Sequence, residues 1–141
     1  MRILLILMLV CGLYGAHQWW QKRNEAHAAA FDATTFVAVE MPNGVQRNTV
    51  LVLAPPNCPS DQAQRTEALI RDLGRAGIPV VRGSGFAFDV ENPSPEQIER
   101  IDRAVAVFKR GAPAVFVNGL AMSNPSAEQA IAAYRASRGR R

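Results

Sequence analysis

The stretch from Thr49 to Asp61, "TVLVLAPPNCPSD", decides the fold of this chain. Its first part, Thr49 to Leu53, is a continuous apolar run, which predicts a strand buried on both faces. Its second part, Pro55 to Asp61, places Cys58 directly before residues that begin a helix. We therefore expect a buried strand, a turn that carries a cysteine, and then a helix.

The helix that follows is predicted from Ser60 to Ala76. Its apolar residues recur at i, i+3, i+4 and i+7, the spacing of one helix face, at Thr66, Leu69, Ile70 and Leu73. Gly77 and Pro79 end this helix. Ile78 to Val81 is then expected to be a second buried strand, and residues 83–93 are expected to form a loop.

A second helix is expected to begin at Ser94. Ser94 and Gln97 have the spacing of a capping box, and Pro95 suits the first helical position. Gly111 is expected to end the helix. Its inner face is predicted to hold Ile98, Ile101, Val105 and Phe108.

The C-terminal part of the chain predicts a hairpin and a last helix. Ala114 to Val117 is apolar and predicts a third strand, and Asn118-Gly119 is the strongest short signal for a hairpin turn. Leu120 to Met122 is expected to return as a fourth strand. Ser126 and Gln129 form another capping box, which predicts a helix to about Ala136.

The fold class that we predict is α/β. Strands that alternate with helices require parallel pairs joined by crossovers, and the Asn118-Gly119 hairpin adds one antiparallel pair. The expected core is a four-stranded mixed sheet flanked by helices. Thr34 to Met41 is β-branched and roughly alternating, so it predicts an extra N-terminal strand.

This element order resembles the thioredoxin fold. Three features carry the resemblance: Cys58-Pro59 between the first strand and the first helix, Ala112-Pro113 before the third strand, and the run "APAVFVNG" that ends in the hairpin. The Cys-Pro sequence is more similar to glutaredoxin than to thioredoxin, because Asn57 stands where thioredoxin has a tryptophan. The resemblance covers about Thr34 to Ala136, and it implies that Pro113 is cis and faces the cysteine.

The resemblance implies a catalytic Cys58, with Pro59, Ala112 and Pro113 in the substrate-binding positions. The position of the second motif cysteine holds Asp61, so a dithiol cycle is impossible within the domain. Glutaredoxins that work with one cysteine use glutathione to release the mixed disulfide. We expect no cofactor, because the chain has no lysine between Lys22 and Lys109 to help bind glutathione. Glutathione stays open as the alternative, with an arginine in place of the lysine.

Two effects on the reactivity of Cys58 compete. With Pro59 at the first helical position, Cys58 is the expected cap residue, and the helix terminus favours its thiolate. The negative charge of Asp61 opposes the thiolate, and Arg65, one turn later, is expected to pair with Asp61. Cys58 is therefore either a reactive thiol or a capping residue in a fold without catalysis.

The N-terminal segment has the features of a membrane segment. Residues 3–16 carry no charge, Arg2 precedes them, and Trp19 and Trp20 suit the headgroup interface. An uncleaved transmembrane anchor and a cleaved signal segment both fit, and Cys11 is expected to be one of its apolar residues. The expected organisation is an anchor or signal at 1–20, a stalk at 21–30, a thioredoxin-like domain at 31–137 and a basic tail at 138–141.

The expected location is a bacterial inner membrane, reached through residues 3–20, with the domain in the periplasm. The net charge of +4 comes without aromatic residues interleaved in a basic stripe, which argues against nucleic acid as a partner. His17 and His27 both precede the domain, so no metal site is expected. A protein client or a small thiol is the expected partner, and the oligomeric state is left open.

The sequence supports two classes of function. The first is a membrane-tethered protein that exchanges disulfides through the single thiol of Cys58. The second is a thioredoxin-fold module that binds or scaffolds a partner at the membrane without catalysis. The Cys-Pro sequence and Pro113 favour the first class, and the absence of a second motif cysteine favours the second.

Overall fold

The computed structural model describes residues 11–18, 34–57 and 59–139. The chain divides into two compact units, Met1–Asp32 and Ala33–Arg141. In the first unit, residues 11–18 are helical and exposed, including the free thiol of Cys11. No helix within the described ranges has the length and apolar character needed to span a bilayer. Most of the expected anchor at 1–20, the stalk at 21–30 and Arg140 and Arg141 of the tail lie outside those ranges.

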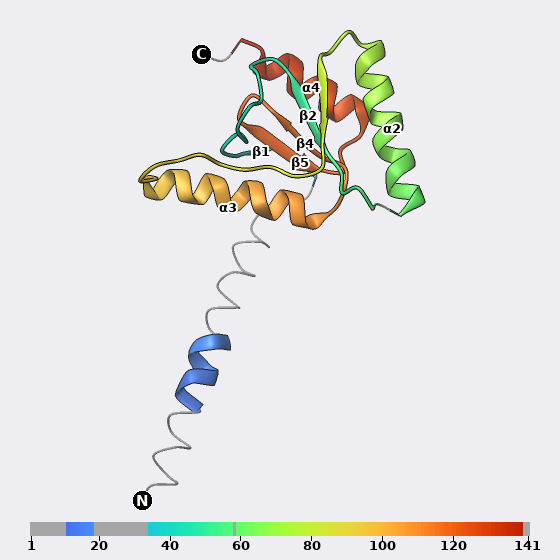
Figure 1. The fold of residues 1–141 in the computed structure, drawn as a ribbon. Helices are drawn as coiled ribbons and strands as arrows, with labels where there is room; N and C mark the ends of the chain where they lie inside the picture. Colours follow the sequence, from blue (N-terminus) through green and yellow to red (C-terminus); the bar gives the residue numbers. More distant parts are fainter. Residues whose placement is uncertain (1–10, 19–33, 58, 140–141) are drawn as a thin grey trace, which may run out of the picture. The chain divides into compact units, whose positions relative to one another are not determined.

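The second unit is built on a five-stranded mixed sheet with the order β1-β5-β4-β2-β3 (Figure 1). The strands are β1 (Val37–Ala38), β2 (Val50–Leu53), β3 (Val80–Gly83), β4 (Ala114–Val117) and β5 (Leu120–Ser123). The helices of this unit are α2 (Ser60–Arg75), α3 (Pro95–Arg110) and α4 (Ala127–Ser137). The expected mixed α/β architecture with an extra N-terminal strand is confirmed.

The expected pairing of the strands was partly wrong. β2 and β3 are parallel, but the pairs β2–β4, β4–β5 and β1–β5 are all antiparallel. The reason is the long connection after β3, which runs beside α3 to the start of that helix, so α3 then returns along the sheet (Figure 1). β4 therefore begins at the edge of the sheet where β2 ends, and it runs in the opposite direction.

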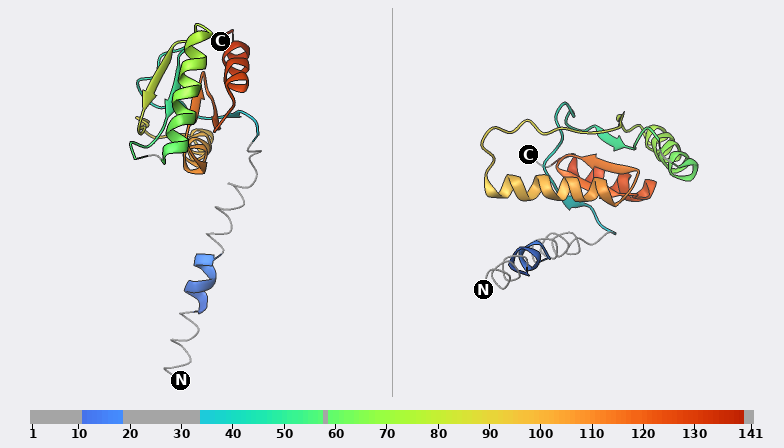
Figure 2. Two further views of the ribbon diagram at one scale, coloured as in Figure 1. Left: turned by 90° about the vertical axis from the view of Figure 1, so that its right-hand side faces the viewer. Right: turned by 60° about the horizontal axis from the view of Figure 1, so that its bottom comes forward.

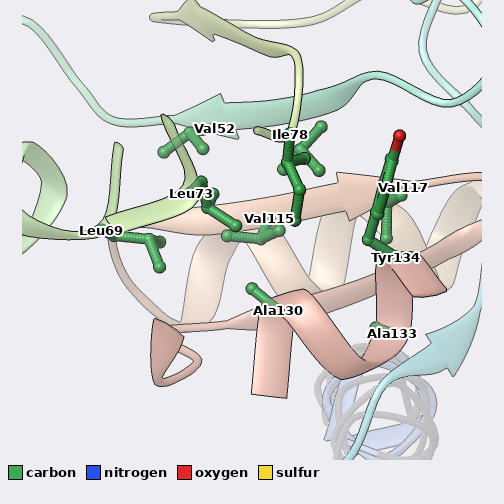
Figure 3. Packing of buried hydrophobic residues seen from close by; sticks show 10 residues of the cluster. Val52, Leu69, Leu73, Ile78, Val115, Val117, Ala130, Ala133 and Tyr134 are labelled. Carbon is green, nitrogen blue, oxygen red and sulfur yellow. The ribbon is translucent and has the colours of Figure 1, made fainter. Parts of the chain in front are cut away.

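Helices cover both faces of the sheet, with α2 and α4 on one face and α3 on the other (Figure 2). Alternate residues of β2 and β4 enter the two layers, which is why both strands are buried throughout. The layer under α2 and α4 holds Val52, Leu69, Leu73, Val115 and Tyr134 (Figure 3). The layer under α3 holds Leu51, Leu53, Phe116, Ala104 and Val107. The continuous apolar run from Thr49 to Leu53 thus contains the central strand β2, buried on both faces as expected.

The second strand differs from its prediction. Instead of a buried strand at Ile78–Val81, β3 runs from Val80 to Gly83 at the edge of the sheet. The side chain of Val81 is 52% exposed. An apolar run indicates a strand but does not tell whether a neighbour lies on both sides, so the burial was overestimated.

The N-terminal strand is shorter than expected, spanning only Val37–Ala38 instead of Thr34–Met41. The inner face of the second predicted helix also differs from its prediction. On α3, Ile98 is 46% exposed, whereas Ala104 and Val107 are the buried residues. A helix of 16 residues is about 24 Å long, and a strand of four residues spans only about 13 Å. The first turn of α3 therefore extends beyond the strands that would cover Ile98.

The local signals for helix starts and for the hairpin are confirmed. Ser94 with Gln97, and Ser126 with Gln129, form complete capping boxes at the starts of α3 and α4. Asn118 and Gly119 adopt φ angles of 45° and 84°, the left-handed values that a two-residue hairpin turn needs.

Leu73 and Ile98 make a matched test of this core. We expect Leu73→Ala to lower the free energy of unfolding by about 2–5 kcal/mol, because Leu73 is fully buried between α2 and the sheet. Ile98→Ala, at a half-exposed position, is expected to cost about 1 kcal/mol or less. Urea unfolding followed by circular dichroism measures both, and equal costs would contradict the assignment of the core.

Candidate functional site

Two of the segments that the sequence singled out lead to the same end of the sheet. β2 ends where β4 begins, because Leu53 lies opposite Ala114 in the antiparallel pair. The chain that leaves β2 leads to Pro59 and the start of α2, and Ala112 and Pro113 directly precede β4. We call this the site edge, formed by Ala54, Pro59, Ala112 and Pro113. Segments far apart in the sequence are thus brought to the same end of the domain.

Cys58 itself lies outside the described residues. Its neighbours in the chain, Asn57 and Pro59, are both described and both exposed.

The start of α2 differs by one residue from the expectation. Pro59 is the cap residue, with φ −52° and ψ 150°, and its carbonyl accepts a hydrogen bond of 3.0 Å from the N–H of Ala63. The helix begins at Ser60, so Asp61 is the second helical residue and not the third. A proline cap has no polar side-chain atom, and α2 accordingly has no side-chain cap hydrogen bond. The N–H groups of its first turn are left for solvent or a ligand.

Asp61 and Arg65 form the expected ion pair, with 3.9 Å between a carboxylate oxygen of Asp61 and a guanidinium nitrogen of Arg65. Both side chains are well exposed, Asp61 at 73% and Arg65 at 50%. Water screens such a pair, so its contribution to stability is less than about 1 kcal/mol. The pair lowers the negative field that Asp61 exerts on its surroundings without cancelling it.

Ala112 and Pro113 are buried, and the peptide bond between them is cis, as the resemblance implied. The carbonyl of Pro113 accepts a hydrogen bond of 2.7 Å from the N–H of Asn124, which fixes Pro113 against the end of β5. Among the described residues, the N–H and C=O groups of Ala112 have no hydrogen-bond partner. This backbone is free to pair with an extended chain at the site edge.

Residues 83–93 were expected to be a plain loop, but Gly83 is the last residue of β3. Its carbonyl accepts a hydrogen bond of 3.0 Å from the N–H of Ala54, so the end of β3 lies at the site edge. Further along, Phe86 packs edge-on against Phe108, with ring centroids 5.0 Å apart. Gly83 allows the close approach of β3 to β2, since a Cβ at Gly83 would lie 2.8 Å from a methyl group of Leu53.

Two cations that the sequence analysis did not single out stand next to the site edge in the chain. Lys109 and Arg110 form the last turn of α3, and only Gly111 separates them from Ala112. No three side chains of the kinds that bind metals come together within the described residues.

No protein-family model, curated protein or solved structure matches this chain.

The charge of Asp61 can be tested through the alkylation of Cys58. Removing a negative charge near a thiolate stabilises the thiolate, so we expect Asp61→Asn to lower the pKa of the Cys58 thiol. A decrease of about half a unit makes alkylation by iodoacetamide at pH 7 about threefold faster. The alkylation rate is measured from pH 5 to pH 10 in a Cys11→Ser background.

Asp72→Asn is the matched control, because Asp72 lies in the last turns of the same helix and pairs with Arg75. It is expected to leave the alkylation rate unchanged. An Asp61→Asn rate equal to that of the control would show that the field of Asp61 does not reach the thiol.

Proposed function

We propose that this chain is a membrane-tethered, thioredoxin-like protein that exchanges disulfides through the single thiol of Cys58. The observation that carries the proposal is the site edge, where Pro59 and the free backbone of Ala112 come from distant segments to one end of the sheet. The expected order of strands and helices around this edge supports it.

The proposed reaction has two exchange steps. The Cys58 thiolate attacks one sulfur of a client disulfide, the client S–S bond breaks, and the other client sulfur leaves as a thiolate that takes up a proton. A second thiol, from the client or from a small molecule, then attacks the mixed disulfide and releases the Cys58 thiolate. Asp61 occupies the position of a resolving thiol, so this second thiol must come from outside the domain.

The other residues of the site edge have supporting roles in this proposal. The N–H and C=O groups of Ala112 pair with an extended client segment, and Pro113 holds that backbone in place through its contact with Asn124. The unpaired N–H groups at the start of α2 favour the thiolate. Lys109 and Arg110 suit the carboxylates of glutathione, the small thiol that the resemblance suggests.

The proposed location is the periplasmic side of a bacterial inner membrane, with residues 3–20 as the tether. Tethering raises the effective concentration of the thiol for a client in the same membrane. We therefore propose a membrane-bound client. Its high effective concentration favours the mixed disulfide with Cys58, which no second cysteine of the domain can release.

A binding or scaffold module at the membrane is the second candidate function. The observation that favours it is the exposed carboxylate of Asp61 in the first turn of α2, where a dithiol enzyme has its second cysteine. In this alternative the backbone of Ala112 still binds an extended partner, and Cys58 does no chemistry.

Cys58→Ser separates the two functions. If Cys58 exchanges disulfides, client proteins trapped as mixed disulfides by acid quenching disappear in Cys58→Ser and persist in Cys11→Ser, since Cys11 lies outside the domain. The measurement is non-reducing electrophoresis of the tagged full chain. Trapped species that persist in Cys58→Ser would contradict thiol exchange at this residue. A partner that still co-purifies with Cys58→Ser would support the binding module.

A further inference from the structure

The second open feature of the domain is the outer edge of β3. β3 is the last strand of the sheet and pairs only with β2. Its residues are half-buried or exposed, and Val81 is 52% exposed. This edge is separate from the site edge, because it runs along the side of the sheet and not across its end.

The hydrogen bonds of β3 show which groups face outward. The carbonyls of Pro79 and Gly83 accept hydrogen bonds from Val50 and Ala54, at 2.9 Å and 3.0 Å. In a parallel pair, alternate residues turn both backbone groups to the same neighbour, so Val81 also faces β2. The N–H and C=O groups of Val80 and Arg82 therefore point away from the sheet. No described residue forms a hydrogen bond with them.

This edge has only weak protection against pairing with another strand. Proteins protect open edges with short strands, bulges, prolines or charged side chains. β3 contains no proline, and its one charged side chain, Arg82, is paired with Glu67 of α2. The edge thus offers free hydrogen-bonding groups, an exposed valine and no net charge.

We propose that β3 pairs with β3 of a second copy of this chain, antiparallel and related by a twofold axis at Val81. Val80 of each copy lies opposite Arg82 of the other as a hydrogen-bonded pair, which uses every outward N–H and C=O group of the strand. Val81 then lies opposite its own counterpart in a non-hydrogen-bonded pair, where side chains approach closely. The two sheets join into one.

Charges on α2 fit the same arrangement. The ion pair with Arg82 places Glu67 level with that residue. Arg71 lies one helical turn further along α2, which runs opposite to β3, so Arg71 is level with Val80. In the proposed register, Val80 of one copy lies opposite Arg82 of the other. Arg71, which is level with Val80, therefore faces Glu67 of the second copy, which is level with Arg82. Arg71 forms no ion pair with another described residue.

The self-complementary register favours a second copy over an unrelated extended peptide. Each copy keeps its site edge open, because the twofold axis passes through the side of the sheet. The proposal is independent of thiol exchange, and its test can be done without Cys58.

Disulfide trapping tests the register directly. In the full chain carrying Cys11→Ser and Cys58→Ser, single cysteines are introduced as Val80→Cys, Val81→Cys and Arg82→Cys, and oxidised with copper phenanthroline. In the proposed register, Cα atoms at position 81 are about 4.5 Å apart, whereas those at 80 or at 82 are about 8 Å apart. Only the first separation allows a disulfide.

We expect Val81→Cys to give at least about tenfold more linked dimer than Val80→Cys or Arg82→Cys alone. A mixture of the Val80→Cys and Arg82→Cys chains is expected to link as a heterodimer, because these positions lie opposite each other, about 5.5 Å apart. Similar yields at all three positions would indicate random collision and overturn the proposal. If neither Val81→Cys nor the mixture gives linked dimer, the proposed pairing of two β3 strands is also overturned. The outer edge of β3 would then bind a different partner or none.

A charge change tests the contact between the two α2 helices. Arg71→Glu places two carboxylates on each side of the axis, and we expect it to lower the yield of linked Val81→Cys dimer severalfold. Arg135→Glu, an equal change on the exposed face of α4, is expected to leave the yield unchanged. Equal yields from the two variants would overturn the register proposed here.

Discussion

The antiparallel pairing of β2 with β4 is the interaction on which the rest of the domain depends. With Leu53 opposite Ala114, these two central strands send alternate side chains into the layers under α2 and α4 and under α3. The same pairing makes β2 end where β4 begins. The apolar core and the site edge therefore have one cause, and a substitution that weakens the pairing would disturb both.

The sequence predicts well what depends on neighbouring residues. The capping boxes at Ser94 and Ser126 and the turn at Asn118-Gly119 involve residues one to three positions apart, so the local sequence specifies them. Burial depends on which elements lie outside a strand or helix. That is why Val81 and Ile98 were expected in the core although they are half-exposed. The direction of β4 likewise depends on the path after β3, which carries no periodic signal.

The candidate site shows the same division. The ion pair of Asp61 with Arg65 follows from their spacing on one helix. That the chain after β2 and the residues before β4 lie at the same end of the sheet does not follow from spacing, because it depends on the antiparallel pairing of these strands. Lys109 and Arg110 were missed although they are close to Ala112 in the sequence, because they belong to none of the motifs that carry the resemblance. Sequence reasoning thus predicted the local ion pair of the candidate site, and the chemistry of Cys58 stays a prediction.

Two of the free backbone stretches among the described residues lie at different borders of the sheet, and we propose different partners for them. At the site edge the free backbone is that of Ala112, a single residue, which suits a short extended segment. Along β3 both Val80 and Arg82 are free, next to an exposed valine and a neutralised charge. Such an edge recognises length and register, which a second copy matches by symmetry. Because the two stretches lie at different borders of the sheet, one can be occupied without closing the other.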